Sequence, residues 1–136
     1  MTQNETATLE AGSKLPPLTR KLTQEGINAY SDAGGDHNPL HVDPEFAATT
    51  RFGGPIAHGM LVLAFISDML TGAFGKSWAE SGSLKVRLRD AARPGDTITA
   101  RGTVVARDGD RLRCDIECVN QDSTVVIDGT AEVAAK

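Results

Sequence analysis

The sequence lacks the features that mark nucleic-acid-binding, exported and membrane proteins. Its 136 residues carry 14 Lys and Arg against 18 Asp and Glu, which gives a formal net charge of −4. This acidic balance, with no basic run to offset it, argues against general nucleic-acid binding. The N-terminus has no basic segment followed by an apolar core, and no stretch approaches the ~20 apolar residues of a membrane span. We therefore expect a cytoplasmic protein with neither a nucleic-acid nor a membrane partner.

Cysteine is also scarce. The two cysteines, Cys114 and Cys118, lie four residues apart in an alternating stretch, so both point to the same face of a predicted strand. A disulfide along one strand is geometrically poor, and two thiols without a further Cys or a nearby His make no zinc set. The sequence therefore predicts two buried free thiols and no metal site.

Length and composition indicate one domain. A chain of this length can bury a core, and its 40% hydrophobic and 24% charged content are near globular averages. Residues 1–13 are mostly polar and show no periodicity, so we expect a flexible tail there. Residues 14–136 should form the single domain.

The first half of this domain predicts short elements separated by irregular segments. Residues 18–22 follow two prolines and suit an edge strand, and the threonine before residues 24–31 can cap a short helix. Residues 32–40 contain a glycine pair and an Asn-Pro step, so we expect irregular chain there. An Asp-Pro step predicts a second short helix over residues 43–48.

The second half predicts one helix and then strands. Residues 56–70 are apolar on nearly all sides, which predicts a helix buried on most sides. Residues 84–88, 97–106, 111–118 and 124–133 alternate or are rich in β-branched residues, which predicts a meander of four strands. The expected fold class is α+β, with an antiparallel sheet wrapped around one long central helix.

Residues 30–60 concentrate the groups that can carry chemistry. They hold all three histidines, five glycines and three of the six prolines, together with Asp36 and Asp43. So many turn formers and titratable groups make a poor core segment and a good candidate site.

Two parts of this stretch resemble a known family. Residues 30–41, Tyr-Ser-Asp-Ala-Gly-Gly-Asp-His-Asn-Pro-Leu-His, followed after five residues by Ala47, resemble the signature of the MaoC-like dehydratases, which include the (R)-specific enoyl-CoA hydratases of the hotdog superfamily. Residues 57–61, Ala-His-Gly-Met-Leu, resemble the family's second recurring segment, at the expected separation. The resemblance covers about residues 14–134. Gly34 departs from the pattern, because serine or threonine is usual there.

The resemblance implies a fold and an activity. It implies a homodimer of hotdog domains with joined sheets, and reversible syn addition of water to a trans-2-enoyl thioester of coenzyme A or acyl carrier protein. We expect no metal or redox cofactor, because nothing in the sequence resembles a ligand set and hydration needs no electron sink. By position, Asp36 and His41 match the catalytic pair, and Gly59 matches the residue whose backbone N–H binds the thioester oxygen. Ser67 falls where some relatives place a polar residue that supports the catalytic loop.

The residues themselves suit this chemistry. Asp36 and His41 lie five apart on a loop stiffened by an Asn-Pro step, so both can reach one water: Asp36 as the base, His41 to hold the water and return the proton. Each also has a structural interpretation, as a turn aspartate bonded to its local backbone and as a loop histidine bonded to a carbonyl. Asn38 is expected to hold the loop by hydrogen bonds instead of taking part in chemistry.

The start of the long helix predicts an oxyanion donor. Gly59 offers a backbone N–H and the positive end of the helix dipole to the developing negative charge, and glycine allows close approach of a ligand. His58 is either a second polar lining group or a buried structural histidine. Ser67, eight residues after Gly59, can share its helix face and bond either the catalytic loop or its own helix backbone.

Two other functions compete with the hydratase. A hotdog thioesterase would need a carboxylate on the long helix, for which Asp68 is the one candidate. A subunit of a heterodimeric dehydratase is the second alternative, in which Asp36 and His41 would make this chain the active partner. The sequence fixes neither the acyl chain length, the carrier, the pathway nor the direction of reaction. Arg87 and Arg89 either meet carrier phosphates or are plain surface charges.

Overall fold

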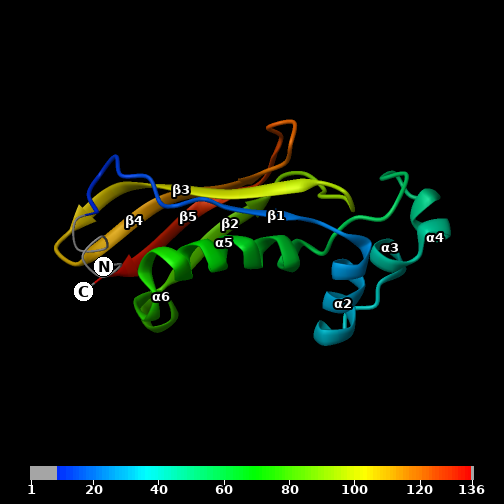
Figure 1. Cartoon of the computed structure of the whole chain (residues 1–136), viewed down its shortest axis with the longest axis horizontal. Coiled ribbons are helices and arrows are strands. Elements are labelled where there is room, and N and C mark those ends of the chain that lie inside the picture. The colour runs from blue at the N-terminus through cyan, green and yellow to red at the C-terminus, as the bar shows by residue number, and fades with distance from the viewer. Residues whose placement is uncertain (1–8, 136) are drawn as a thin grey trace.

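A five-stranded antiparallel sheet and one long helix form the frame of the structure. The computed structural model describes residues 9–135, and helix α5 runs along one face of the sheet (Figure 1). The strands lie in the order β1-β3-β4-β5-β2. The elements are α2 (Gln24–Gly34), α3 (Pro39–Val42), α4 (Pro44–Ala48), α5 (Gly59–Phe74) and α6 (Lys76–Ser81), with β1 (Leu18–Lys21), β2 (Ser83–Leu88), β3 (Thr97–Asp108), β4 (Arg111–Val119) and β5 (Val125–Ala134). The expected α+β class is confirmed.

The meander covers three strands instead of the expected four. β3, β4 and β5 pair in sequence order, whereas β2 lies at the far edge of the sheet on β5, with Leu88 opposite Ile127. β3 instead takes β1 as its outer neighbour. Residues 89–96 therefore connect β2 at one edge of the sheet to β3, which lies next to the other edge strand. The expectation was wrong because alternation decides which face a side chain takes and does not decide the partner of a strand.

The helices before α5 follow the expected caps but not all the expected bounds. The side chain of Thr23 accepts a hydrogen bond from the backbone N–H of Gly26 and caps α2 as expected. α2 then continues to Gly34 and ends at Gly35, whose φ of 73° is left-handed. Irregular chain is therefore confined to residues 35–38 within the segment that was expected to be irregular throughout. α6 was not expected from the sequence.

Helix α5 starts and ends later than expected, and only one of its faces is covered. Ile56 and Ala57 lie outside the helix, and their N–H groups bind the carbonyls of Leu40 and Ala92 at 3.3 and 2.7 Å. The sheet-facing side is buried, while Met60 on the other side is 63% exposed. The expectation of burial on most sides is therefore wrong for the single chain. The buried residues of the helix are Val62, Ile66, Met69, Leu70 and Phe74.

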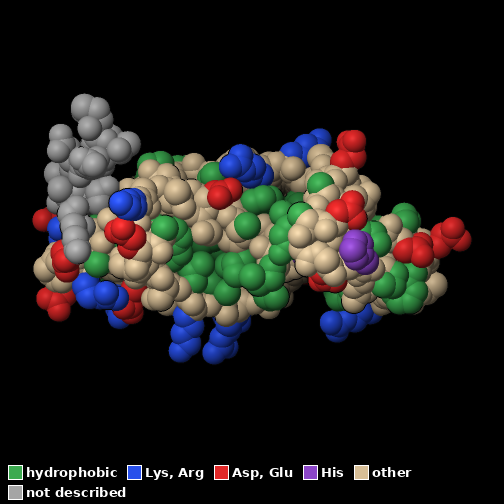
Figure 2. Space-filling model, turned by 90° about the horizontal axis from the view of Figure 1, so that it is seen from below, with side chains coloured by type: hydrophobic (Ala, Val, Ile, Leu, Met, Phe, Trp, Pro, Cys, Tyr) green, Lys and Arg blue, Asp and Glu red, His purple; other side chains and the backbone are tan. Residues whose placement is uncertain are grey.

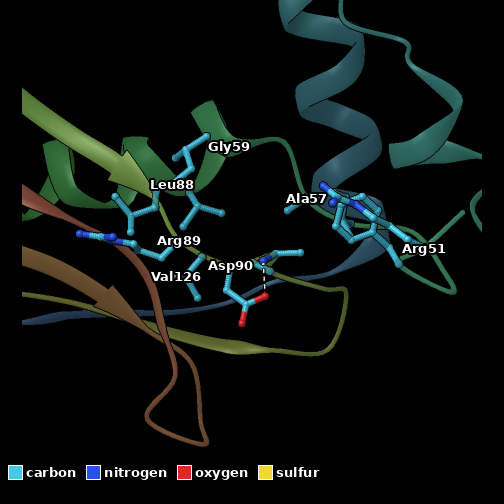
Figure 3. A pocket seen from close by; sticks show the side chains of 13 residues that line it. Arg51, Ala57, Gly59, Leu88, Arg89, Asp90 and Val126 are labelled. Atoms are coloured by element: carbon cyan, nitrogen blue, oxygen red, sulfur yellow. Dashed lines mark hydrogen bonds between the residues drawn. The ribbon is translucent and has the colours of Figure 1, made fainter.

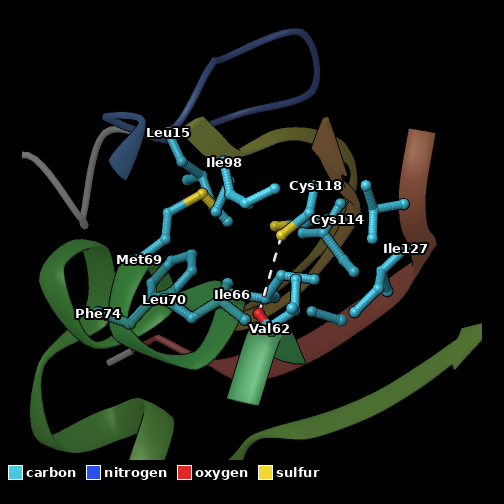
Figure 4. Packing of buried hydrophobic residues seen from close by; sticks show 14 of the residues in the cluster. Leu15, Val62, Ile66, Met69, Leu70, Phe74, Ile98, Cys114, Cys118 and Ile127 are labelled. Atoms are coloured by element: carbon cyan, nitrogen blue, oxygen red, sulfur yellow. Dashed lines mark hydrogen bonds between the residues drawn. The ribbon is translucent and has the colours of Figure 1, made fainter. Parts of the chain in front are cut away.

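The core lies between α5 and the concave face of the sheet (Figure 4). Alternate residues of β4 point into it, among them both cysteines, which are fully buried free thiols as expected. The thiol of Cys118 lies 3.9 Å from the carbonyl oxygen of Val62 on α5. This packing fixes the position of α5, and with it the start of the helix at Gly59.

The residues that precede β1 are attached to β3. The N–H of Gly12 donates to the carbonyl of Val104 at 2.7 Å, and a side-chain nitrogen of Arg107 donates to the carbonyl of Leu9 at 2.6 Å. Residues 1–8 of the expected tail lie outside the described residues. Within residues 9–135, no helix combines the length and the apolar character needed to cross a bilayer.

The buried thiols generate a prediction about pH. Burial, and then the charges of Asp115 and Glu117, raise the pKa of Cys114 to about 11 and that of Cys118 to about 12. Unfolded thiols ionise first, at about pH 8.5, so we expect the free energy of unfolding to fall from that pH upward until the native thiols ionise as well. At neutral pH, iodoacetamide should label both cysteines only in urea, as mass spectrometry can measure. Rapid labelling of the native protein would contradict the burial.

Candidate active site

Two Xaa-Pro steps shape the loop between α2 and α4. The side chain of Asn38 accepts a hydrogen bond from the N–H of Leu40 at 3.0 Å, with proline at the first position of α3. Asp43 accepts from the N–H groups of Glu45 and Phe46 in the same way at α4. The loop is therefore a pair of capped short helices, and His41 stands at a defined place in the first of them.

Asp36 lies in the irregular part of this loop. Its side chain is exposed, and one carboxylate oxygen accepts a hydrogen bond from the N–H of Asn38 at 3.3 Å. Its backbone carbonyl accepts two hydrogen bonds, from the hydroxyl of Ser31 at 2.5 Å and from Nε2 of His58 at 3.0 Å. The backbone of Asp36 is therefore held while its carboxylate stays accessible.

The contacts of His41 define which of its nitrogens is free. Nδ1 lies 2.8 Å from the carbonyl oxygen of Ile56. A carbonyl oxygen only accepts, so Nδ1 carries the hydrogen and donates it. Nε2 is then the nitrogen available to a ligand, as a base or water-holding group requires.

His58 is buried beneath the loop. It is 3% exposed, and its ring stacks on that of His41 with centroids 3.8 Å apart and an interplanar angle of 28°. The ring of Tyr30 lies against it at 4.8 Å. Its Nδ1 is buried without a hydrogen-bond partner among the described residues. Of the two interpretations of His58, these contacts favour the buried structural histidine over a polar group that lines a pocket.

Asp36, His41 and His58 form one cluster. One ligand atom from each lies within 4.8 Å of the others, a spacing at which metal ions are also held. However, the two imidazole planes are nearly parallel, which directs ring lone pairs side by side instead of toward one point. This arrangement suits proton transfer better than metal binding, and the absence of a metal stays a prediction.

A pocket of about 590 Å³, lined by apolar residues together with Arg51, Arg89 and Asp90, opens beside the start of α5. Gly59 and Leu88 lie together on one side of it, and Arg51 lies on the opposite side (Figure 3). The N–H of Gly59 is in the first turn of α5, where backbone donors have no partner within the helix. A Cβ added at Gly59 would lie only 2.8 Å from Cδ1 of Leu88, so a larger residue fits at this position only if the Leu88 side chain moves.

The cluster and the pocket share a wall. The lining of the pocket includes Ile56, Ala57 and Gly59 but not the side chains of Asp36 and His41. Residues 56–59 separate them. The carbonyl of Ile56 binds His41, the ring of His58 stacks on that of His41, and Gly59 lines the pocket. The structure therefore brings the expected catalytic pair together and connects it to Gly59 through one short segment.

Ser67 does not contact the catalytic loop in the described chain. Its hydroxyl accepts a hydrogen bond from the indole N–H of Trp78 on α6 at 3.0 Å. Within the described residues, neither of the two expected partners, the catalytic loop and the helix's own backbone, is the partner of this hydroxyl, which instead joins two helices. Sequence reasoning also missed Tyr30 as a partner of His58, although the aromatic residue is part of the quoted signature and could have been a signal.

Comparisons with known proteins show the family of the chain. The family described as MaoC like domain matches residues 6–126. The (R)-specific enoyl-CoA hydratase of Aeromonas caviae is 35% identical over 102 residues, 72% of each chain. The 3-hydroxybutyryl-CoA dehydratase of Methylorubrum extorquens is 30% identical over 117 residues, 85% of this chain and 74% of that protein. The chain spans only 35% of another relative, the enoyl-CoA hydratase ChsH3 of Mycobacterium tuberculosis, which is 36% identical over 102 residues, 74% of this chain.

Solved structures show the same fold. The unliganded R-hydratase PhaJ1 of Pseudomonas aeruginosa superposes with a TM-score of 0.86 at 30% identity, over 96% of this chain and 84% of that one. The (R)-hydratase of Aeromonas caviae gives a TM-score of 0.83 at 28% identity, over 95% and 98% of the two chains. The chain therefore belongs to the MaoC-like domain family and has the hotdog fold of its R-hydratases.

Proposed function

We propose that this chain is an (R)-specific enoyl-thioester hydratase, or in the reverse direction a 3-hydroxyacyl-thioester dehydratase. The proposal rests on one observation: a candidate acid–base pair is connected, through one short segment, to the N-terminus of a long helix. Asp36 and His41 lie within one cluster, and the segment that binds His41 leads directly to the first residue of α5 beside the pocket. Relatives named as hydratases and dehydratases support the same reaction.

The proposed step uses one water. The water is held between the carboxylate of Asp36 and Nε2 of His41, and its oxygen bonds to C3 of the enoyl group as Asp36 takes a proton. The proton on Asp36 then passes to Nε2 of His41, which delivers it to C2 on the same face, while the other hydrogen of the water stays on the new hydroxyl. The pair is unchanged at the end, because it gives to C2 as many protons as it takes from water.

Gly59 supplies the electrostatic part of the mechanism. Attack at C3 puts negative charge on the thioester oxygen, and donors aimed at that charge lower the barrier. The free N–H of Gly59 and the positive end of the α5 dipole meet this need. Arg51 and Arg89 also line the pocket, and their charge suits the anionic part of an acyl carrier. Arg89 is already paired with Asp128 at 3.0 Å.

The thioesterase alternative finds less support. Its expected carboxylate, Asp68, is exposed and lies 3.5 Å from the guanidinium of Arg20 on β1. Asp68 does not line the pocket beside Gly59. A carboxylate in that position is not aimed at the thioester carbonyl that the pocket would hold.

We also propose a homodimer formed along β2. This strand is an edge of the sheet, and the N–H and C=O groups along such an edge can pair with a second copy. Leu88 at its end is 64% exposed, and hydrophobic side chains gather on the α5 side of the molecule (Figure 2). A second copy would extend the sheet and cover this apolar face.

Substitution of the acid–base pair tests the reaction. We expect Asp36→Asn and His41→Ala each to lower the hydration of crotonyl-coenzyme A by about 10²- to 10⁴-fold, measured by the loss of enoyl-thioester absorbance. His37→Ala is the matched control, because within residues 9–135 this exposed neighbour pairs only with Asp32, and the substitution should leave the rate unchanged. The product should be the (R)-3-hydroxy thioester. Release of free thiol would favour the thioesterase, and full activity of either variant would refute the assigned roles.

Gly59→Ala tests the oxyanion donor. The added methyl would stand beside the N–H that the thioester oxygen approaches, and we expect a loss of about 10²-fold in kcat, as for a lost oxyanion donor. The fold should tolerate the change, because the nearest atom that the methyl meets is at the end of the flexible Leu88 side chain. Gly72→Ala on the same helix is the control, since its Cβ would meet no atom within 4 Å. Equal rates for the two variants would contradict a close approach of the thioester oxygen to the N–H of Gly59.

Light scattering tests the assembly. A homodimer has twice the chain mass of 14.4 kDa, and we expect this value at the concentrations used for the assay. A fully active monomer would contradict the proposed dimer. An inactive monomer that becomes active with a second, different chain would indicate the heterodimeric alternative.

A further inference from the structure

His58 touches each part of the proposed site without facing the pocket. It is 3% exposed and is absent from the pocket lining, whereas the next residue, Gly59, lines it. Its ring contacts His41, and its Nε2 contacts the backbone of Asp36. A residue in this position cannot act on substrate directly, but it can set where the acting groups lie.

The hydrogen bond of His58 holds the main chain of Asp36. Because the carbonyl of Asp36 only accepts, Nε2 of His58 carries the hydrogen and donates it at 3.0 Å. The hydroxyl of Ser31 on α2 donates to the same oxygen at 2.5 Å. The peptide after Asp36 is thus fixed from two elements, α2 and the cap of α5, and of these two donors only His58 connects it to the oxyanion helix.

The stacking contact holds the ring of His41. The two imidazoles lie 3.8 Å apart at 28°, and Nδ1 of His41 donates to the carbonyl of Ile56 at 2.8 Å. One contact fixes the plane of the ring and the other fixes its rotation within that plane. Both come from residues 56–58, so the direction of the free Nε2 is set by the segment that also positions Gly59.

The unpaired Nδ1 of His58 indicates that stability alone does not explain a histidine at this position. It is buried and has no hydrogen-bond partner among the described residues, which is unfavourable for folding. A phenyl ring would fill the same space without that defect. Histidine at this position is therefore poorly explained by packing alone, while its donor on Asp36 and its stack on His41 are explained by the geometry of the site.

We infer that His58 is a positioning residue that ties the acid–base pair Asp36 and His41 to the oxyanion donor Gly59. The inference rests on the proposed function for its kinetic part. Misplacement of reacting groups by about 1 Å costs on the order of 10² in rate. His58 thus controls the rate through its neighbours, and the rate is what a substitution there should change.

Two variants separate its two contacts. His58→Phe keeps a ring for stacking and loses the donor, whereas His58→Gln keeps an amide donor and loses the ring. We expect His58→Phe to lower kcat by about 10²-fold with KM and the midpoint of thermal unfolding not reduced, and His58→Gln to recover part of the loss. In a His41→Ala background, His58→Phe should add little, because its effect passes through the pair. An equal loss in both backgrounds, or a fall in thermal stability that matches the fall in rate, would indicate a structural role only.

Nitrogen-15 NMR of the imidazoles tests the contacts without substrate. With three histidines in the chain, the ring signals are few. At mildly alkaline pH we expect hydrogen on Nδ1 of His41 and on Nε2 of His58, and the signals of His41 should shift in His58→Phe while those of the exposed His37 stay. Unchanged His41 signals would overturn the inference whatever the activity. Shifted signals in a protein that hydrates no enoyl thioester would leave the positioning contact standing and overturn the proposed function alone.

Discussion

Three hydrogen bonds join the loop around Asp36 to the segment that leads into α5, and the rest of the site depends on them. The N–H of Ile56 binds the carbonyl of Leu40, His41 binds the carbonyl of Ile56, and His58 binds the carbonyl of Asp36. Each uses a backbone carbonyl or N–H, so the bonds fix main chain as well as rings. Without them an exposed loop and the end of a helix would have no defined relation. With them, the cluster and the pocket have one common wall.

Much of the fold could be predicted from local chemistry. Caps and turns, such as Thr23 before α2, depend on residues within four positions of one another, and their prediction was correct. The pairing of β2 with β5 could not be predicted, because the alternation of apolar and polar residues does not determine the neighbour of a strand in the sheet. The start of α5 was misplaced for a similar reason. The N–H groups of Ile56 and Ala57 donate to carbonyls that are distant in the sequence, and no local sequence pattern indicates these hydrogen bonds.

For the candidate site, sequence spacing predicted which residues lie near one another but not how their side chains are oriented. Asp36 and His41 lie five apart on one loop, so their proximity follows from the chain itself, while their roles stay predictions. The stacking of His58 on His41 joins residues 17 positions apart and required the fold to be known. For Ser67, the sequence predicted its place on α5 but not its hydrogen-bond partner. The hydroxyl accepts from the indole N–H of Trp78 on α6, a helix that was not expected.

The buried imidazole of His58 shows how stability and geometry are divided in this protein. The sheet and α5 enclose apolar side chains and fix the frame, so the frame can tolerate one polar atom without a partner. Leaving a buried nitrogen unpaired costs about 1–3 kcal/mol, a sizeable part of the ~5–15 kcal/mol that typically stabilises a domain. A group held at that cost beside an accessible carboxylate and a free helix N-terminus is best understood through what it orients. The polar contacts of residues 56–58 therefore set the geometry of the site, while the apolar core supplies the stability that these contacts require.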